Sequence, residues 1–361
     1  MGVTIALDAM GGDRAPSEIV RGAIDAAGRD DGPERILLVG RRRDIDAQLE
    51  SRGIPPGGNG VLELRDASQV VEMDEAPALA LRRKRDSSIK VSTRLLASGE
   101  ADALVTAGNT GAAVVASWLV LERAEGIDRP ALAAFLPAGN GYCVMVDAGA
   151  NVDCSPGQLV QFALMGSDCV RTYLGLDRPR VGILSNGEEK GKGNSVTVEA
   201  AEILEELGRR GGVRFVGNVE GREIPRGVVD VLVTDGFVGN IVLKTAEGAV
   251  QEVFRALKES LSEGWAQRLA LALLAPSLKG LKRRYGHSSY GGAMLLGVKA
   301  PVIVAHGSSE GESISSAIKL ACSCVACKRG QAPNEHTLPL NNVQKGPGPF
   351  CTPRSDGSGK T

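Results

Sequence analysis

The stretch 178–207, RPRVGILSNGEEKGKGNSVTVEAAEILEEL, carries a strand signal, a polar loop and a helix signal in succession. Residues 180–184 are mostly apolar, whereas residues 196–207 repeat apolar side chains with a period near 3.6 residues. Three glycines, two acids and two lysines separate them. A strand joined to a helix by such a loop is the repeating unit of an α/β sheet.

The same unit recurs along most of the chain. Its strand candidates are rich in Val, Ile and Leu without polar alternation, which is typical of a sheet covered on both faces. They occupy residues 3–9, 35–40, 60–66, 101–108, 142–149, 179–186, 213–218, 229–236 and 300–307. This pattern predicts a doubly wound, three-layer α/β/α fold with a mostly parallel sheet. One exception is expected at 131–149, where Gly139 and Gly141 suggest a hairpin and an antiparallel pair.

The composition indicates a soluble globular protein. Of the 361 residues 43% are apolar and 24% are charged, which suggests one large α/β domain or two smaller ones. A net charge of -1 gives no general affinity for nucleic acid. Seven irregularly spaced cysteines favour a reducing cytoplasm over a disulfide framework. The N-terminus does not resemble a signal peptide, and the apolar run 269–275 is too short to span a bilayer.

Many strand candidates end in a glycine-bearing polar loop. Six such loops contain DAMGGD, TAGNTGA, DAGANVD, SNGEEKGKGN, TDGFVGN and AHGSSEG. Open α/β sheets bind ligands at the carboxyl ends of their strands, so we expect these loops to meet at one edge and form a site. Glycines also close tight turns for purely geometric reasons, and that alternative stays open for each single loop.

The loop 184–195 has the chemistry of an anion site. Gly191 and Gly193 leave backbone amides exposed, Asn194 and Ser195 are good helix caps, and the following helix directs its positive end at the loop. Lys192 adds a cation, so the most direct prediction is phosphate binding. The P-loop spacing is absent, and a solvated charged loop remains the alternative. Residues 106–120 repeat the design, with Asn109-Thr110-Gly111 before an apolar helix.

Other motifs have weaker claims. The basic run 82–85 beside Ser87 and Ser88 can meet a phosphate or an acidic partner, although such runs are usually solvated. GSSEG at 307–311 matches the nucleophile-elbow pattern of hydrolases, but His336 is the only later histidine and it lies in a tail without periodicity. Cys322, Cys324 and Cys327 give one C-x-x-C without a second pair, which argues weakly for zinc. No G-x-G-x-x-G supports a dinucleotide site.

Two segments differ from the α/β pattern. Residues 241–285 predict two helices that break near Gly264 or Pro276, with an apolar stretch beside a basic cluster at 279–284. That combination suits a helix pair on an anionic membrane surface, and equally a subunit-interface or core helix. Residues 326–361 are rich in Pro, Gly, Ser and Asn and predict a disordered tail.

Taken together, the motifs resemble those of the bacterial phosphate acyltransferases of phospholipid synthesis, the PlsX-type acyl-(acyl-carrier-protein):phosphate acyltransferases. The resemblance covers about residues 3–325, with Met294 standing where the family pattern suggests Pro. It is carried by IALDAMGGDRAPSEIVRGA, RRKRDSSI, VTAGNTGA, GIDRPALA, VDAGANVDCSP, QFALMGS, NGEEKGKGN, VTDGFVGNIVLKT and YGGAMLLGVKAPVIVAHGSS.

The resemblance implies one acyltransferase domain at 1–325, related to phosphotransacetylases and the isocitrate dehydrogenase group. It implies a homodimer without metal or nucleotide cofactor, which transfers a long acyl chain from acyl carrier protein to inorganic phosphate. The product would be an acyl phosphate for a downstream acyltransferase. The protein would be cytoplasmic, with the helix pair 241–285 touching the membrane. Two alternatives are a phosphotransacetylase-like enzyme using acyl-coenzyme A and a non-catalytic membrane-surface scaffold.

Residue roles carry over by matching motif. Lys192 and Asn240 are the expected catalytic residues, because a cation and an amide can hold the phosphate or the oxyanion that develops on the thioester. Phosphate- or substrate-binding residues are expected at Asp8, Gly11, Gly12, Ser88, Asn109, Thr110, Gly111, Asn151, Asn186, Gly187, Gly193, Asn194, Asp235 and Gly236. Membrane contacts are expected from Trp265, Leu269, Leu271, Leu273 and Leu274. A cationic face at Arg82–Arg85 or Lys279–Arg284 would suit an acidic carrier protein.

Overall fold

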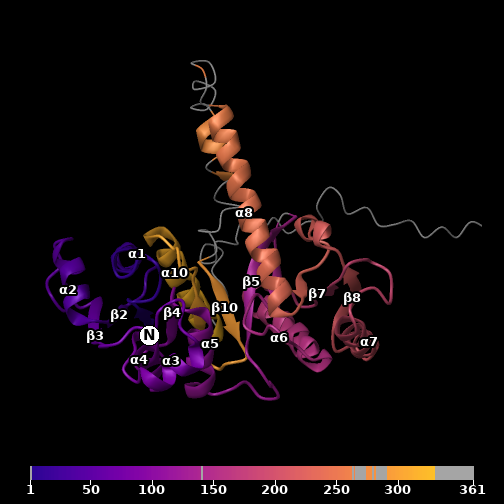
Figure 1. Ribbon diagram of the computed structural model, residues 1–361, viewed down its shortest axis with the longest axis horizontal. Coiled ribbons are helices and arrows are strands. Elements are labelled where there is room, and N and C mark those ends of the chain that lie inside the picture. The colour runs from indigo at the N-terminus through magenta and orange to yellow at the C-terminus, as the bar shows by residue number, and fades with distance from the viewer. Residues whose placement is uncertain are drawn as a thin grey trace, which may run out of the picture.

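A single mixed sheet forms the centre of the protein. The computed structural model describes residues 2–139, 141–261, 264, 274–278, 280, 281 and 291–329. Within them, 11 strands pair in the order β3-β2-β1-β4-β11-β10-β5-β6-β9-β7-β8 (Figure 1). Their bounds are β1 Thr4–Asp8, β2 Arg35–Gly40, β3 Leu62–Asp66, β4 Ala103–Thr106, β5 Ala131–Ala138, β6 Gly141–Val146, β7 Arg180–Leu184, β8 Arg214–Val219, β9 Val231–Val233, β10 Ala293–Leu296 and β11 Val302–Val304.

Helices cover both faces of the sheet. One apolar cluster includes Ile5 and Leu7 of β1 and the other includes Ala6, because successive strand residues point to opposite faces. The first cluster is covered by α1 (Ser17–Ala27), α2 (Arg42–Glu50), α6 (Pro156–Leu174), α7 (Ser195–Arg209) and α10 (Gly311–Lys328). The second is covered by α3 (Pro77–Arg83), α4 (Ser88–Ala97), α5 (Thr110–Val120), the 3₁₀ helix η1 (Gly221–Arg226) and the start of α8 (Gly236–Ser260). The predicted three-layer α/β/α fold is confirmed.

The sheet changes direction in its middle. Strands β1 to β5 and β11 run one way, and β6 to β10 run the other way, since β10 is antiparallel to both neighbours and β5 is antiparallel to β6. The expected hairpin at 131–149 is therefore confirmed. The prediction that all six glycine loops leave one edge is wrong. Three follow β1, β4 and β11, and three follow β6, β7 and β9, at the opposite edge.

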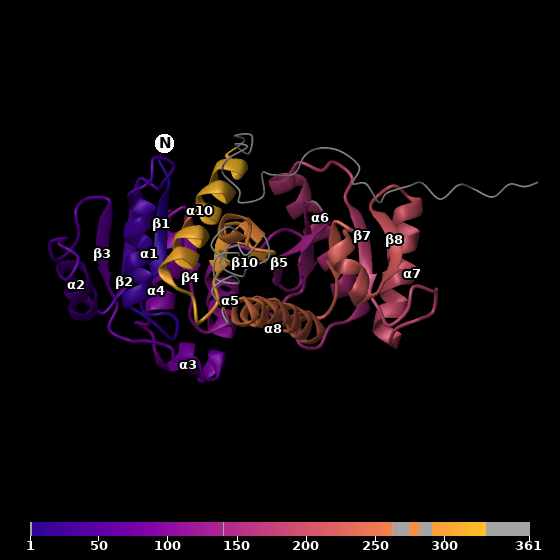
Figure 2. The ribbon, with the colours of Figure 1, turned by 90° about the horizontal axis from the view of Figure 1, so that it is seen from above.

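The twist of the sheet offsets this reversal in space. Helices α1 and α10 lie above the strands in Figure 1, whereas α6 and α7 lie below them, although all four pack against the same apolar cluster. The sheet has thus turned over between its two halves, as accumulated strand twist allows. Helices α5 and α8, which follow loops from the two different edges, are neighbours in Figures 1 and 2. Val242 and Leu243 of α8 pack against the cluster that α5 helps to form.

Several boundaries differ from the sequence prediction. Strand β10 was not predicted, because its four residues AMLL stand between glycines. Helix α8 begins at Gly236 rather than at residue 241, since Asp235 caps it by accepting a hydrogen bond from the Val238 amide at 2.8 Å. Helix α10 continues to Lys328, so the tail cannot begin at 326. Beyond 329 the predicted tail lies outside the described residues.

Helix α8 rises from the body of the molecule (Figure 1). Only Gly236 and Gly239 are buried among its 25 residues. Of the second predicted helix, residues 274–278, 280 and 281 are helical, and the rest lies outside the described residues. No described helix combines the length and apolarity needed to cross a membrane.

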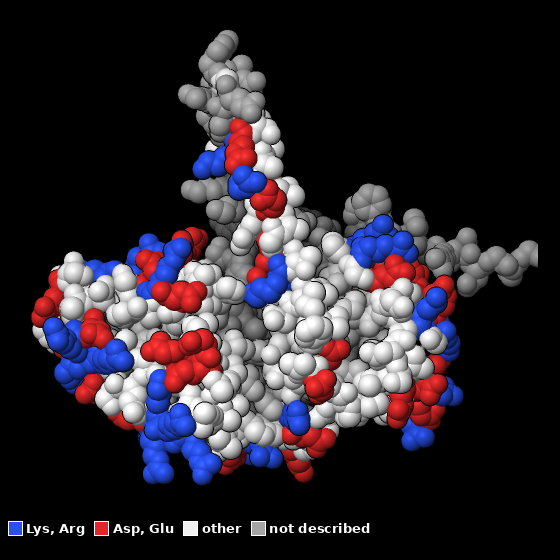
Figure 3. Space-filling view, viewed as in Figure 1, with Lys and Arg blue, Asp and Glu red and all other residues white. Residues whose placement is uncertain are grey.

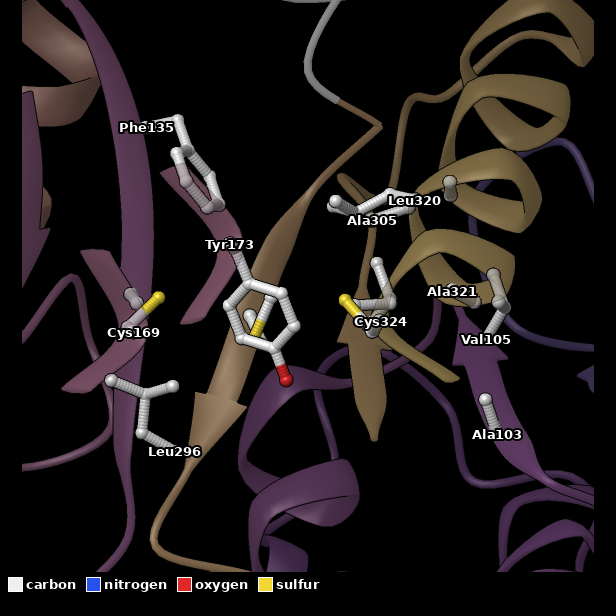
Figure 4. Packing of buried hydrophobic residues seen from close by; sticks show 14 of the residues in the cluster. Ala103, Val105, Phe135, Cys169, Tyr173, Leu296, Ala305, Leu320, Ala321 and Cys324 are labelled. Atoms are coloured by element: carbon white, nitrogen blue, oxygen red, sulfur yellow. The ribbon is translucent and has the colours of Figure 1, made fainter. Parts of the chain in front are cut away.

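The three cysteines considered for zinc lie on α10 near the core. Figure 4 shows Tyr173 and Cys169 of α6 facing Cys324 of α10 among apolar side chains. Burial raises the pKa of the Cys169 and Cys322 thiols to about 12, which disfavours the thiolate that binds metals. The described residues contain no group of three His, Cys, Asp or Glu side chains suited to a metal ion.

Candidate functional site

The loops after β1, β4 and β11 pack tightly against one another. A Cβ atom on Gly11 would lie 2.6 Å from the Gly108 amide nitrogen, so the first two loops touch through glycine backbone. Gly12 has a φ of +110°, and the next amide, that of Asp13, donates to the Gly307 carbonyl at 2.8 Å. These contacts explain why glycines recur here, and Gly11 and Gly108 also line a small cavity.

That cavity is a small hollow that is partly open to solvent. It lies where β1 and β4 end and where α4 and α5 begin. Its lining residues are Asp8, Gly11, Val71, Ser88, Ile89, Thr106, Gly108, Asn109 and Ala112. Four of the predicted binding residues are thus brought together, namely Asp8, Gly11, Ser88 and Asn109, whereas Gly12, Thr110 and Gly111 stand next to lining residues.

Asp8 is the ionisable group of this cavity. Only 2% of the residue is exposed, and its Oδ2 accepts a hydrogen bond from the Thr106 hydroxyl at 2.8 Å. Burial raises the pKa of Asp8 above its ordinary value, while hydrogen bonds from the Ser88 and Thr106 hydroxyls and the Met10 amide act in the opposite direction. None of the described ion pairs includes Asp8.

Asn109 has a structural role that the sequence did not reveal. Its Oδ1 accepts from the Ala112 amide at 3.0 Å and caps α5. Its Nδ2 donates to the carbonyls of Glu72, Met73 and Glu75 at 3.0–3.2 Å. The side chain is therefore committed to the protein, and what this helix start offers a ligand is the backbone of Thr110 and Gly111.

The second group of loops begins with residues 185–194 after β7. Lys190 pairs with Glu205 of α7 at 2.5 Å. Lys192 is exposed, and its ammonium has no ion pair or hydrogen bond to any described residue. Its side chain crosses Gly187, where an added Cβ would lie 2.9 Å from the Lys192 Cγ atom. The predicted cation is thus available at the end of a strand.

The remaining residues of this loop shape its backbone. Asn194 caps α7 by accepting from the Thr197 amide at 2.9 Å. Gly193 has a φ of +118°, and a Cβ there would lie 2.2 Å from the Thr197 hydroxyl. Asn218 of β8, which the sequence analysis missed, donates to the carbonyls of Glu189 and Lys192. Asn186 is exposed and Gly187 is buried.

The loops after β6 and β9 hold the start of α8. The Gly236 amide donates to the Asn151 carbonyl at 2.7 Å, and a Cβ on Gly239 would lie 1.9 Å from the Asp147 carbonyl oxygen. Asn240 is exposed on the first turns of the helix, with its side chain against Gly149. The Asn151 amide group donates to Asp147 and to the Pro130 carbonyl, so Asn151 supports the loop.

Asp147 is the main residue of this region that the sequence analysis missed. It is fully buried, and its carboxyl group accepts five hydrogen bonds from N–H donors at 2.7–3.2 Å. The signal was present in the sequence, since an Asp ending an apolar strand before a Gly-Ala-Asn turn can collect the turn's amides. Asp235 and Gly236 were predicted as binding residues, and the structure shows Asp235 as the cap of α8.

The serine motif GSSEG and the basic run at 82–85 lie in different environments. Ser309, the central serine of GSSEG, is buried, and the described histidine His306 contacts Ser308 through Nδ1 at 2.8 Å. His336 lies outside the described residues. In the basic run, Lys84 pairs with Glu75, whereas Arg82, Arg83 and Arg85 are exposed and have no ion pair with a described residue. Figure 3 shows Lys and Arg side chains gathered below α3.

The predicted membrane contacts fall mostly outside the structure. Trp265, Leu269, Leu271 and Leu273 lie outside the described residues. Leu274 is helical and 48% exposed.

Comparison with known proteins bears on the family. The model of the family described as "Fatty acid synthesis protein" matches residues 3–330. The phosphate acyltransferase of Pelotomaculum thermopropionicum is 47% identical over 317 residues, which cover 88% of this chain and 90% of the relative. The phosphate acyltransferase of Myxococcus xanthus is 46% identical over 321 residues, 88% of each chain.

A solved structure extends the likeness of fold. The phosphotransacetylase of Streptococcus pyogenes superposes with a TM-score of 0.58 at 18% identity, covering 91% of this chain and 94% of that one. This likeness shows a shared α/β architecture. On the evidence of the family model and the two relatives, the chain belongs to the fatty acid synthesis protein family of phosphate acyltransferases and is an acyltransferase enzyme.

Proposed function

We propose that the protein transfers a long acyl chain from the thioester of acyl carrier protein to inorganic phosphate, and that the acyl phosphate feeds a downstream acyltransferase of phospholipid synthesis. The observation that carries this proposal is the exposed loop after β7, which holds the available cation Lys192 at a strand end. A small cavity at the starts of two helices, lined by Asp8, adds to it.

The chemistry requires few protein groups. Phosphate is itself the nucleophile, so the enzyme has to hold a charged anion against the thioester carbonyl and stabilise the oxyanion that develops. Lys192 supplies a positive charge, and Asn240 supplies an amide donor. The N-terminus of α8, beside Asn240, adds the positive end of the helix dipole. The cavity at Asp8 takes the phosphate, because α4 and α5 both begin at its wall and the N-terminus of a helix carries a partial positive charge.

We assign binding of the acyl carrier protein to the basic run at residues 82–85, and membrane contact to a separate surface on α8. The exposed Arg82, Arg83 and Arg85 would attract an acidic carrier protein. Reversing these charges should slow carrier-protein binding, and unchanged binding would remove this surface from the proposal.

Helix α8 supports a homodimer with peripheral membrane contact. Its exposed apolar side chains need a partner surface, and they include Phe237, Ile241, Val253 and Leu257. Cosedimentation with anionic vesicles and light scattering of the full chain test the two parts. A monomer that leaves vesicles unbound would contradict this assignment and the expected peripheral localisation.

A second candidate is a phosphotransacetylase-like enzyme that uses acyl-coenzyme A. It is favoured by the superposition on a phosphotransacetylase. Measuring thiol release from palmitoyl-carrier protein and from palmitoyl-coenzyme A, each with and without phosphate, separates the two.

The test of the catalytic loop is Lys192→Ala against Lys190→Ala. Both changes remove one lysine from the same loop, but Lys190 is already paired with Glu205. We expect Lys192→Ala to lower phosphate-dependent thiol release by about 100-fold or more, as for loss of an oxyanion contact. Equal small effects of the two variants would contradict the role of Lys192.

A further inference from the structure

The loop that carries Lys192 makes few hydrogen bonds of its own. Among the described residues, one hydrogen bond joins backbone groups within 186–193, from the Lys192 amide to the Glu189 carbonyl at 3.2 Å. It closes a four-residue turn whose third residue, Gly191, has a φ of +87°, as in a type II turn. The Lys192 side chain leaves the end of this turn, so the position of its ammonium depends on how firmly the turn is held.

Asn218 of β8 holds both ends of that turn. Its Nδ2 donates to the Glu189 carbonyl at 2.9 Å and to the Lys192 carbonyl at 3.3 Å. A side-chain amide has two N–H donors, so Asn218 uses both of them on this turn. The side chain thus ties the first and last residues of the turn to a strand of the central sheet, which is the rigid part of the molecule.

A bulge in β8 directs Asn218 at the loop. The register between β7 and β8 shifts by one residue at Val216, and the next residue, Gly217, has a φ of +102°. Phe215 packs against the apolar cluster that α7 covers, whereas Val219 belongs to the cluster on the other face of the sheet. Residues four apart in a regular strand would share one face. The bulge therefore places Asn218, which precedes Val219, on the face where the loop enters α7.

We propose that Asn218 is a positioning residue of the acyl transfer: by holding the turn at residues 189–192, it fixes the Lys192 ammonium where negative charge develops in the reaction. The inference rests on the proposed function, in which Lys192 supplies the positive charge, and adds to it the residue that places this charge. Because Asn218 donates to backbone carbonyls, it acts through the turn and not on the reacting atoms. A displacement of about 1 Å in such a site can lower a rate by about 100-fold.

The test is a double-mutant cycle in the phosphate-dependent thiol-release assay. Asn218→Ala should lower kcat by about 10- to 100-fold in the otherwise unchanged protein. It should change kcat by less than about 2-fold when Lys192 is already replaced by alanine, because a positioning residue has no effect once the group that it places is gone. Asn218→Asp keeps the size of the side chain but lacks both donors, so it should behave alike, and it decides if the alanine variant does not fold.

Arg222→Gln is the matched control, because Arg222 also reaches the loop, through a 3.7 Å ion pair with Glu188. Both side chains are exposed, and such pairs contribute little in water, so kcat should stay within about 2-fold of the wild type. Hydrogen exchange gives a readout apart from activity. Residues 185–194 should exchange faster in Asn218→Ala, whereas α6 should keep its rate. Unchanged exchange of the loop, or equal losses of kcat with and without Lys192, would overturn the inference.

The single variants separate this inference from the proposed function. If Lys192→Ala leaves thiol release unchanged, the proposed role of Lys192 is refuted and the role of Asn218 is refuted with it. If Lys192→Ala lowers kcat by about 100-fold and Asn218→Ala leaves it unchanged, only the inference about Asn218 is refuted. A loss in both single variants, without a further loss in the double variant, supports both.

Discussion

Asp147 offers a sharp test of how the site is held together. Its Oδ1 accepts from the amides of Leu132, Gly149 and Ala150, and its Oδ2 accepts from the backbone and side-chain amides of Asn151. Asp147→Asn keeps the shape but turns one oxygen into an N–H donor. At least two buried donors then lose their acceptor, at about 1–3 kcal/mol each. We expect the free energy of unfolding to fall by about 2–6 kcal/mol.

Asp147→Asn should also lower the rate of phosphate-dependent thiol release. The Asn151 carbonyl accepts a hydrogen bond from the Gly236 amide, and Gly149 lies against the Asn240 side chain. Loosening the loop after β6 should therefore displace the start of α8. Denaturant unfolding gives the stability, and phosphate-dependent thiol release under native conditions gives kcat and KM. Asp153→Asn is the control, because Asp153 is an exposed acid six residues along the chain. If the two variants unfold within about 0.5 kcal/mol of each other, the structural role of Asp147 is refuted.

Four further substitutions test the charge of two carboxylates and the packing of helix α8. Relative to Asp8→Asn, the wild type should lose stability as the pH rises from acid to neutral, because burial raises the folded-state pKa of Asp8 and its ionisation costs stability as the pH rises through that value. Thermal melting against pH checks this. Gly239→Ala should destabilise by about 1–3 kcal/mol through contact with backbone, whereas Gly248→Ala, in open space on the same helix, should stabilise by about 0.5–1 kcal/mol. Asp31→Asn should cost under about 1 kcal/mol at neutral pH. The ion pair with Lys319 lowers the pKa of Asp31, so the cost should vanish once acid protonates this carboxylate. The same difference in melting temperature between variant and wild type at neutral and at acidic pH would contradict this expectation.

The sequence predicts the strands well because their burial is local information. Runs such as ILLVG at 36–40 and VLV at 231–233 are apolar throughout, and each lies in a strand of the sheet. The direction of the two halves is not local. It depends on the pairing of β5 with β6 and of β10 with both its neighbours. The four residues AMLL of β10 are too few for the sequence pattern to predict a strand. The single-edge prediction failed for that reason.

The site shows a similar division. Residue types at strand ends indicated Lys192 and Asp8. The structure places Lys192 on an exposed loop and Asp8 in the wall of a cavity, and their roles in binding and catalysis stay predictions. The pattern could not separate ligand-binding side chains from helix caps. Asn109, Asn194 and Asp235 each accept a hydrogen bond from the helix that they precede. Caps and anion sites use the same residue types at the same positions, so only the contacts distinguish them.

The proposed reaction is tested by identifying the product that the enzyme forms from palmitoyl-carrier protein and inorganic phosphate. Phosphorus NMR or trapping with hydroxylamine distinguishes an acyl phosphate from free fatty acid. We expect acyl phosphate in amounts equal to the thiol released, and a sharp loss of both in Lys192→Ala. Thiol release without phosphate, with free fatty acid as the product, would contradict it.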